Sequence, residues 1–231
     1  MPGDVWVGVV ACWFGAGIIQ DSGTPVLWAT VASVLIYMFG LADNDIVGAQ
    51  TDRGRPIPDG EISIRAARIA RALCLFAAAG LALVKCPIAH ARLPIEWWGA
   101  ALALVASILV YNRTKWWWLM GVCRGLNVLC GGAVAFAAMK GWGDGKTGSC
   151  TLALAAVVLV WTGYIAAVTK YSEGEEADAA KKRRVGFLVG AIVYLQIIAL
   201  LLFQSGVAVL AVALLVVMRL MKRFLPEVSA S

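Results

Sequence analysis

Long apolar stretches separated by shorter polar connections dominate this chain. A helix needs about 20 largely apolar residues to cross the hydrocarbon core of a bilayer. Eight stretches approach that requirement, at roughly 5–19, 25–42, 64–84, 95–111, 117–139, 150–169, 185–203 and 206–221. Only the connections near 43–62 and 170–184 are long. The pattern predicts an all-α fold, a polytopic bundle of about eight transmembrane helices that forms one domain over residues 1–231.

Lys and Arg are distributed unequally between the two sides that alternating spans define. The connections after the second, fourth and sixth stretches, together with the end after the eighth, carry twelve of them, against four on the other side. Basic residues concentrate in the cytoplasmic loops of membrane proteins. We therefore expect both termini and both long connections to lie in the cytoplasm.

The composition narrows the class of protein. Hydrophobic residues make up 61% of the chain and charged residues 15%, and the mean hydropathy is +0.81. These values exclude a disordered chain and argue against a soluble domain. The net charge of +6 would suggest nucleic acid in a soluble protein, but here it follows from membrane topology. The expected partner is the lipid bilayer, with no nucleic acid.

Closely spaced carboxylates open the connection after the second apolar stretch. Asp45 and Asp52 would lie two turns apart, about 10.5 Å along one face, if the helix continued through them, and Asn44 lies beside the first. Two carboxylates on one face favour a hard cation such as Mg²⁺, completed by phosphate oxygens. Arg55 follows and could bind a phosphate bidentately. The alternative is a solvated acidic loop with a Pro-Gly turn.

Basic residues near or inside the spans extend this polar region. Arg65, Arg68 and Arg71 recur every three residues and either reach lipid headgroups or face an anionic ligand. Arg124 and Asn127 share one helical face well inside a span. A charge there is costly, so it needs a carboxylate partner, a polar interior or an anionic ligand.

A last polar group lies at the same predicted side. Lys115 follows the fourth stretch, and Lys170 follows the sixth. Glu173 and Glu176 form an i,i+3 pair that could hold a second Mg²⁺. The alternative is a surface helix whose Glu and Lys side chains pair with each other.

Two consecutive motifs resemble the first signature of the UbiA superfamily of intramembrane prenyltransferases. They are Asn-Asp-Ile-Val-Gly-Ala-Gln-Thr-Asp over 44–52 and Arg-Pro-Ile-Pro-Asp-Gly-Glu-Ile-Ser over 55–63. Gly48 stands where the superfamily has a third Asp. The second signature of the superfamily has two acidic residues four apart, and only the Glu173 and Glu176 spacing stands in for it here.

The resemblance implies Mg²⁺-dependent transfer of an isoprenyl group from a prenyl diphosphate to an aromatic or lipid-type acceptor. It also implies a UbiA-like bundle, with one helix fewer than the usual nine. Two alternatives stay open: a terpene cyclase acting on the prenyl diphosphate alone, and a non-catalytic lipid-binding or transport-linked protein. The implied catalytic residues are Asp45, Asp52 and Asn44; the metal ligands are Asp45, Asp52, Glu173 and Glu176; and the diphosphate-binding residues are Arg55, Arg68, Lys115, Arg124, Asn127 and Lys170.

Overall fold

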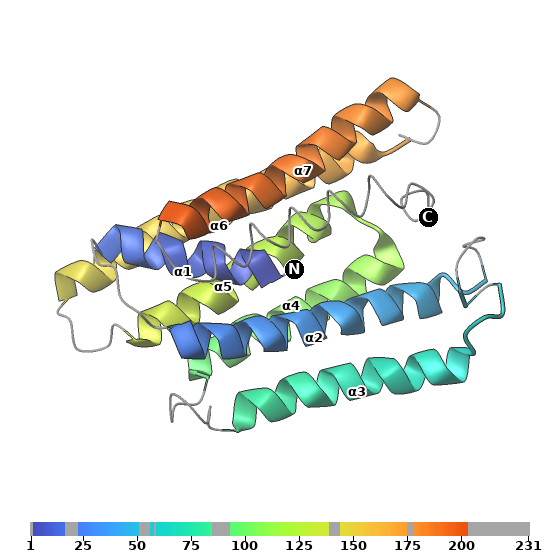
Figure 1. Cartoon of the computed structure of the whole chain (residues 1–231), viewed down its shortest axis with the longest axis horizontal. Coiled ribbons are helices and arrows are strands. Elements are labelled where there is room, and N and C mark those ends of the chain that lie inside the picture. The colour runs from blue at the N-terminus through green and yellow to red at the C-terminus, as the bar shows by residue number, and fades with distance from the viewer. Residues whose placement is uncertain are drawn as a thin grey trace.

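Seven helices form the described part of the protein. The computed structural model describes residues 2–16, 23–50, 56–57, 59–84, 93–138, 144–174 and 178–202. Within those ranges the chain is helical and contains no strand. The helices lie along one another as an elongated bundle (Figure 1). They are α1 (Pro2–Ala16), α2 (Gly23–Val47), α3 (Ile64–Leu83), α4 (Ile95–Thr114), α5 (Trp117–Ala138), α6 (Asp144–Ser172) and α7 (Ala179–Leu202).

The expected number of about eight spans is not supported. Among the described residues, five helices are long and apolar enough to cross a membrane, namely α2 to α6. Helix α1 has 15 residues and its apolar part covers only Asp4–Trp13, which is shorter than a bilayer requires. Helix α7 begins with four consecutive basic residues, 181–184. The eighth predicted stretch, 206–221, lies outside the described residues.

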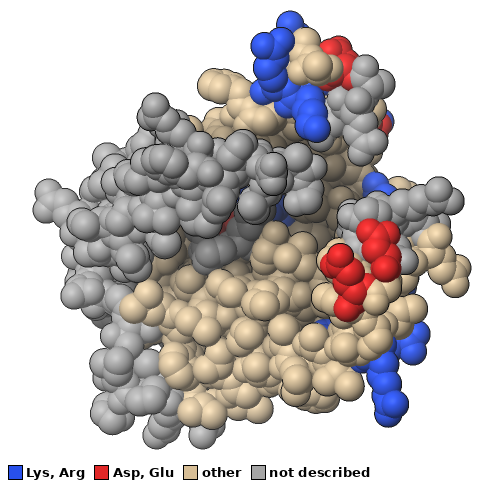
Figure 2. Space-filling view, turned by 45° about the vertical axis from the view of Figure 1, so that its right-hand side comes forward, with Lys and Arg blue, Asp and Glu red and all other residues tan. Residues whose placement is uncertain are grey.

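The helices alternate in direction, so that one end of the bundle collects the basic connections. Helices α2, α4 and α6 end there, and α3, α5 and α7 begin there (Figure 1). We call this the basic end. On the face shown in Figure 2, charged side chains gather in separate groups around a broad uncharged surface. The collection of the basic connections at one end matches the alternation of charge that the sequence predicted.

Helix α5 occupies the centre of the bundle because glycines let its neighbours approach closely. A methyl group on Gly121 would overlap the carbonyl oxygen of Thr162 on α6. A methyl group on Gly131 would overlap the carbonyl oxygen of Val5 on α1. Small residues at such crossings are how membrane helices bring their backbones together. Through Gly131, α5 sets the position of α1 within the bundle.

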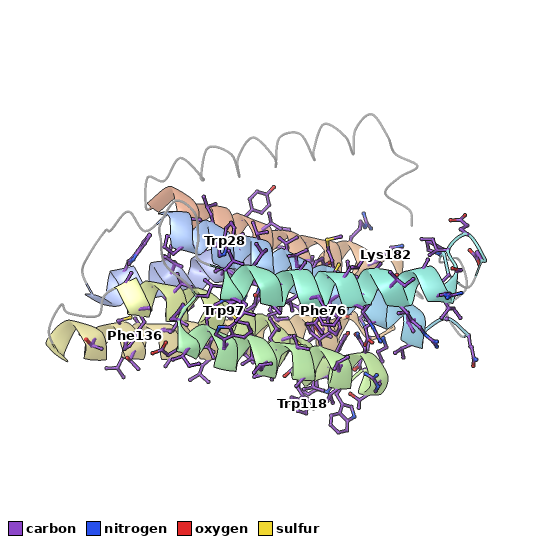
Figure 3. The ribbon with its side chains drawn as sticks, turned by 90° about the horizontal axis from the view of Figure 1, so that it is seen from below. Trp28, Phe76, Trp97, Trp118, Phe136 and Lys182 are labelled. Carbon is purple, nitrogen blue, oxygen red and sulfur yellow. The ribbon has the colours of Figure 1, made fainter. Side chains whose placement is uncertain are left out.

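The tryptophans divide between the core and the surface. Trp97 is only 2% exposed and packs edge to face on Trp98, with ring centroids 5.7 Å apart. Trp118 is 43% exposed and points away from the bundle (Figure 3). Cys150 is a free, buried thiol.

Candidate functional site

A cavity of about 270 Å³ lies between α2, α4 and α5. Helix α2 lines it with one continuous stripe at spacings of three and four residues, from Ser33 to Asn44. Eleven residues of helix correspond to about 16 Å, so the cavity runs for several turns along the bundle. Its remaining wall is mostly apolar and comes from Leu104, Ile108, Tyr111 and Asn112 on α4 and from Met120, Cys123, Arg124 and Asn127 on α5.

Polar side chains gather where the cavity meets the basic end. Asn44 lines the cavity, and its Oδ1 accepts a hydrogen bond from Lys115 Nζ. Lys115 ends α4 in the left-handed conformation, with φ of 53°, and its Nζ lies 5.8 Å from the ring centroid of Tyr111. The half-buried Asp45 follows Asn44 in the last turn of α2. A cation and an amide therefore lie together at this mouth, and a carboxylate is carried by the next residue of α2.

A second polar group forms the opposite, inner end of the cavity. Arg124 is seven residues inside α5, about 10 Å from its first residue. Asn127 lies one turn further along and accepts a hydrogen bond of 2.7 Å from Ser33 Oγ. Arg124 and Asn127 are 8% and 3% exposed. The structure therefore separates these two predicted diphosphate-binding residues from Asn44 and Lys115, although Asn44 lines the same cavity as they do.

Asp4 is the partner of this inner group, and the sequence analysis missed it. Its carboxylate is fully buried, and Oδ2 lies 2.9 Å from Arg124 Nε and 3.4 Å from Asn127 Nδ2. Oδ1 accepts hydrogen bonds from Trp161 Nε1 at 3.1 Å and from Gln196 Nε2 at 2.7 Å. All four partners are N–H donors, as an ionised carboxylate requires. One carboxylate on α1 thus joins α5, α6 and α7.

The buried carboxylate at the basic end is Asp43, which the sequence analysis did not assign to the site. Its Oδ1 accepts a hydrogen bond of 2.6 Å from Arg71 Nη1, and its Oδ2 accepts one of 2.9 Å from Asn112 Nδ2. Asn112 Nδ2 also donates to the carbonyl of Gly40 at 3.1 Å. Arg71 therefore binds a carboxylate instead of a lipid headgroup. Both oxygens of Asp43 are used to tie α2 to α3 and α4.

The expected helical face that joins Asp45 to Asp52 does not form. Helix α2 ends at Val47, and residues 48–50 form a turn in which Gly48 N donates to the carbonyl of Asn44. Asp52 and Arg55 lie outside the described residues. Gly stands at position 48, directly after the helix, and glycine is a poor helix former. The two-turn spacing of Asp45 and Asp52 required the helix to continue through both residues, and α2 ends before it can do so.

The remaining predicted site residues do not join the cavity. Arg68 is exposed on α3. Lys170 Nζ donates to Glu173 Oε2 at 2.7 Å, and both side chains are more than half exposed. This is the surface Glu–Lys pairing that the sequence left open as the alternative. Glu176 lies outside the described residues. Across the described ranges, no three His, Cys, Asp or Glu side chains come together as metal ligands would.

Comparison with known proteins adds no further constraint on the site. No protein-family model, curated protein or solved structure matches this chain. The cavity and the polar groups at its two ends are therefore the features that indicate a function. Chemically, the mouth offers a cation and oxygen ligands, and the wall between the ends suits hydrocarbon.

Proposed function

We propose that the protein is a Mg²⁺-dependent intramembrane prenyltransferase, which transfers an isoprenyl group from a prenyl diphosphate to an aromatic or lipid-type acceptor. The observation that carries the proposal is the apolar cavity that Asn44 lines at its mouth, where Lys115 binds Asn44 and Asp45 is the next residue of α2. A diphosphate needs charge and oxygen-ligated Mg²⁺, whereas an isoprenyl chain needs an apolar wall. The mouth lies at the basic end, which we propose to be cytoplasmic together with both termini.

The mouth supplies a partial set of Mg²⁺ ligands in this proposal. The ion commonly takes one or two carboxylates and completes its coordination with substrate phosphates and water. Asp45 with the adjacent Asn44 supplies such a partial ligand set, to which Asp52 would add. Glu173 is already paired with Lys170, so a second ion there would have to break that pair. Bound Mg²⁺ would neutralise the charge that develops on the departing diphosphate.

The residues of the chain have separable tasks in this proposal. Lys115 is held beside Asn44, where its ammonium can neutralise a diphosphate oxygen as the bond to the isoprenyl carbon breaks. Asp43 fixes Asn112 and Arg71 and so keeps α2 and α4 in register around the cavity. The apolar wall excludes water from an allylic cation, which leaves a bound acceptor to capture it.

The test is turnover of farnesyl diphosphate by purified protein in nanodiscs, with Mg²⁺ and a lipid extract as the source of acceptor. We expect prenylated product and released diphosphate from the wild type, and loss of both in Asp45→Asn. The matched control is Asp59→Asn, which removes an exposed acidic residue near the same connection. Wild-type turnover in Asp45→Asn would refute the site assignment. A cyclic hydrocarbon formed without acceptor would indicate the cyclase alternative.

Two observations favour a second candidate, a lipid-binding protein that does not turn the substrate over. Glu173 and Lys170 are paired with each other, and Gly48 replaces the middle carboxylate of the first motif. Both remove ligands that a two-metal reaction would use. Saturable, Mg²⁺-dependent binding of intact farnesyl diphosphate without release of diphosphate would support this candidate.

A further inference from the structure

The inner end of the cavity contains a buried hydrogen-bond donor without a protein acceptor. Arg124 is 8% exposed, and its Nη2 is buried with no hydrogen-bond partner in the described part of the chain. Arg124 also lines the cavity. Leaving such a donor unsatisfied costs about 5- to 150-fold in an equilibrium constant. A ligand that brings an oxygen to this end would recover that cost.

The charge at the inner end is already compensated. A guanidinium stays protonated in proteins, and Arg124 Nε lies 2.9 Å from Asp4 Oδ2. The other described side chains that donate hydrogen bonds to Asp4 are neutral amides and an indole, from Asn127, Gln196 and Trp161. A second anion would leave one net negative charge buried among helices, which is unfavourable. A neutral oxygen would satisfy the donor without adding charge.

The size of the cavity limits what can bind there. A dry cavity of about 150 Å³ holds one benzene molecule, so about 270 Å³ holds roughly two groups of five or six carbons. That space fits the reacting five-carbon unit of one ligand at the mouth and a ring-sized or short-chain second group at the inner end. A purely hydrocarbon group at the inner end would leave Arg124 Nη2 unsatisfied.

The geometry points to a second binding subsite at Arg124, Asn127 and Ser33, which takes a neutral carbonyl or un-ionised hydroxyl oxygen of an apolar ligand and excludes carboxylates. Asp4 sets this preference by compensating the charge of Arg124. If the ligand of this subsite is the acceptor of the prenyl group, the inference rests on the proposed function. Occupancy of the subsite by itself needs neither Mg²⁺ nor a prenyl diphosphate.

Three probes of matched size separate the possibilities: acetophenone with a carbonyl, benzoate with a carboxylate, and isopropylbenzene with no oxygen. Binding of each radiolabelled probe to the full chain in nanodiscs is measured by equilibrium dialysis at pH 7, and partition into empty nanodiscs is subtracted. We expect saturable binding of acetophenone at least about tenfold tighter than that of benzoate or isopropylbenzene. The inference is overturned if benzoate or isopropylbenzene binds as tightly as acetophenone. It is also overturned if acetophenone shows no saturable binding.

The Asp4→Asn variant tests the origin of the preference. It keeps the shape of the side chain but leaves the charge of Arg124 uncompensated, so the ratio of acetophenone to benzoate affinity should fall at least about tenfold. The control is Lys182→Gln, which removes a cation on α7 that does not line the cavity, and should leave the ratio unchanged. An unchanged ratio in folded Asp4→Asn overturns the inference, and if that variant does not fold, the wild-type ranking decides. Because prenyl diphosphate is absent, failure here is distinct from failure of prenyl transfer.

Discussion

Replacing Asp4 with alanine tests whether a buried ion pair fastens α1 to the rest of the bundle. Arg124 Nε and Asp4 Oδ2 are 2.9 Å apart, which corresponds to about 6 kcal/mol of Coulomb attraction at an effective dielectric constant of 20. Breaking a buried pair by removing one partner costs about 3–5 kcal/mol, because the other charge stays buried and uncompensated. We therefore expect Asp4→Ala to lower the free energy of unfolding by about 3–5 kcal/mol.

The assay is a double-mutant cycle measured by reversible SDS unfolding in mixed micelles, followed by tryptophan fluorescence. The single variants are Asp4→Ala and Arg124→Met, and the double variant combines them. Because the double variant leaves neither charge buried, its loss should fall short of the sum of the single losses by at least about 2 kcal/mol. Additivity within about 0.5 kcal/mol would show that the two side chains do not interact and would refute the arrangement of α1.

The other predictions concern packing, the basic end and the surface pair. Gly131→Ala should lower the free energy of unfolding by about 1–3 kcal/mol, because its methyl group overlaps the carbonyl oxygen of Val5 on α1. The control is Gly163→Ala in α6, which meets open space and should be neutral or stabilising by up to about 1 kcal/mol. Equal effects of the two substitutions would contradict the packing of α1 on α5. Asp43→Asn should cost about 1.5–3 kcal/mol in the same assay, because it removes a charge-assisted hydrogen bond to Arg71; an unchanged midpoint would argue against the pair. Lys170→Gln should change stability by less than about 1 kcal/mol, because its partner is an exposed side chain, and a larger loss would show that it contributes to the core.

The helices that the sequence predicted best are the ones with enough apolar residues to cross a bilayer on their own. Stretches 25–42 and 95–111 correspond to α2 and α4, which run on to Val47 and Thr114. The polar residues at those ends stay helical because they bind neighbouring helices: Asp43 and Asn112 bind each other. Apolar periodicity alone stops at the first charge and therefore misses this last turn.

The sequence predicted the polar mouth but not the pairing of the charges. Ile36, Phe39 and Asp43 follow one another at spacings of three and four residues, and Ile36 and Phe39 are buried. This helical stripe was the signal that could have assigned Asp43 to the interior. Asp4 gave a weaker signal, since it precedes an apolar stretch and looks like a residue at a helix end. Its burial depends on where α1 starts relative to α5, α6 and α7, which is a tertiary property that no local pattern contains.

The central claim is that the cavity between α2, α4 and α5 binds and consumes a prenyl diphosphate. The most direct measurement is mass spectrometry of purified protein in nanodiscs after incubation with prenyl diphosphates of several lengths, with Mg²⁺ or with a chelator. We expect loss of the prenyl diphosphate and release of diphosphate only when Mg²⁺ is present. Failure of every chain length to bind or react in the presence of Mg²⁺ would contradict the central claim.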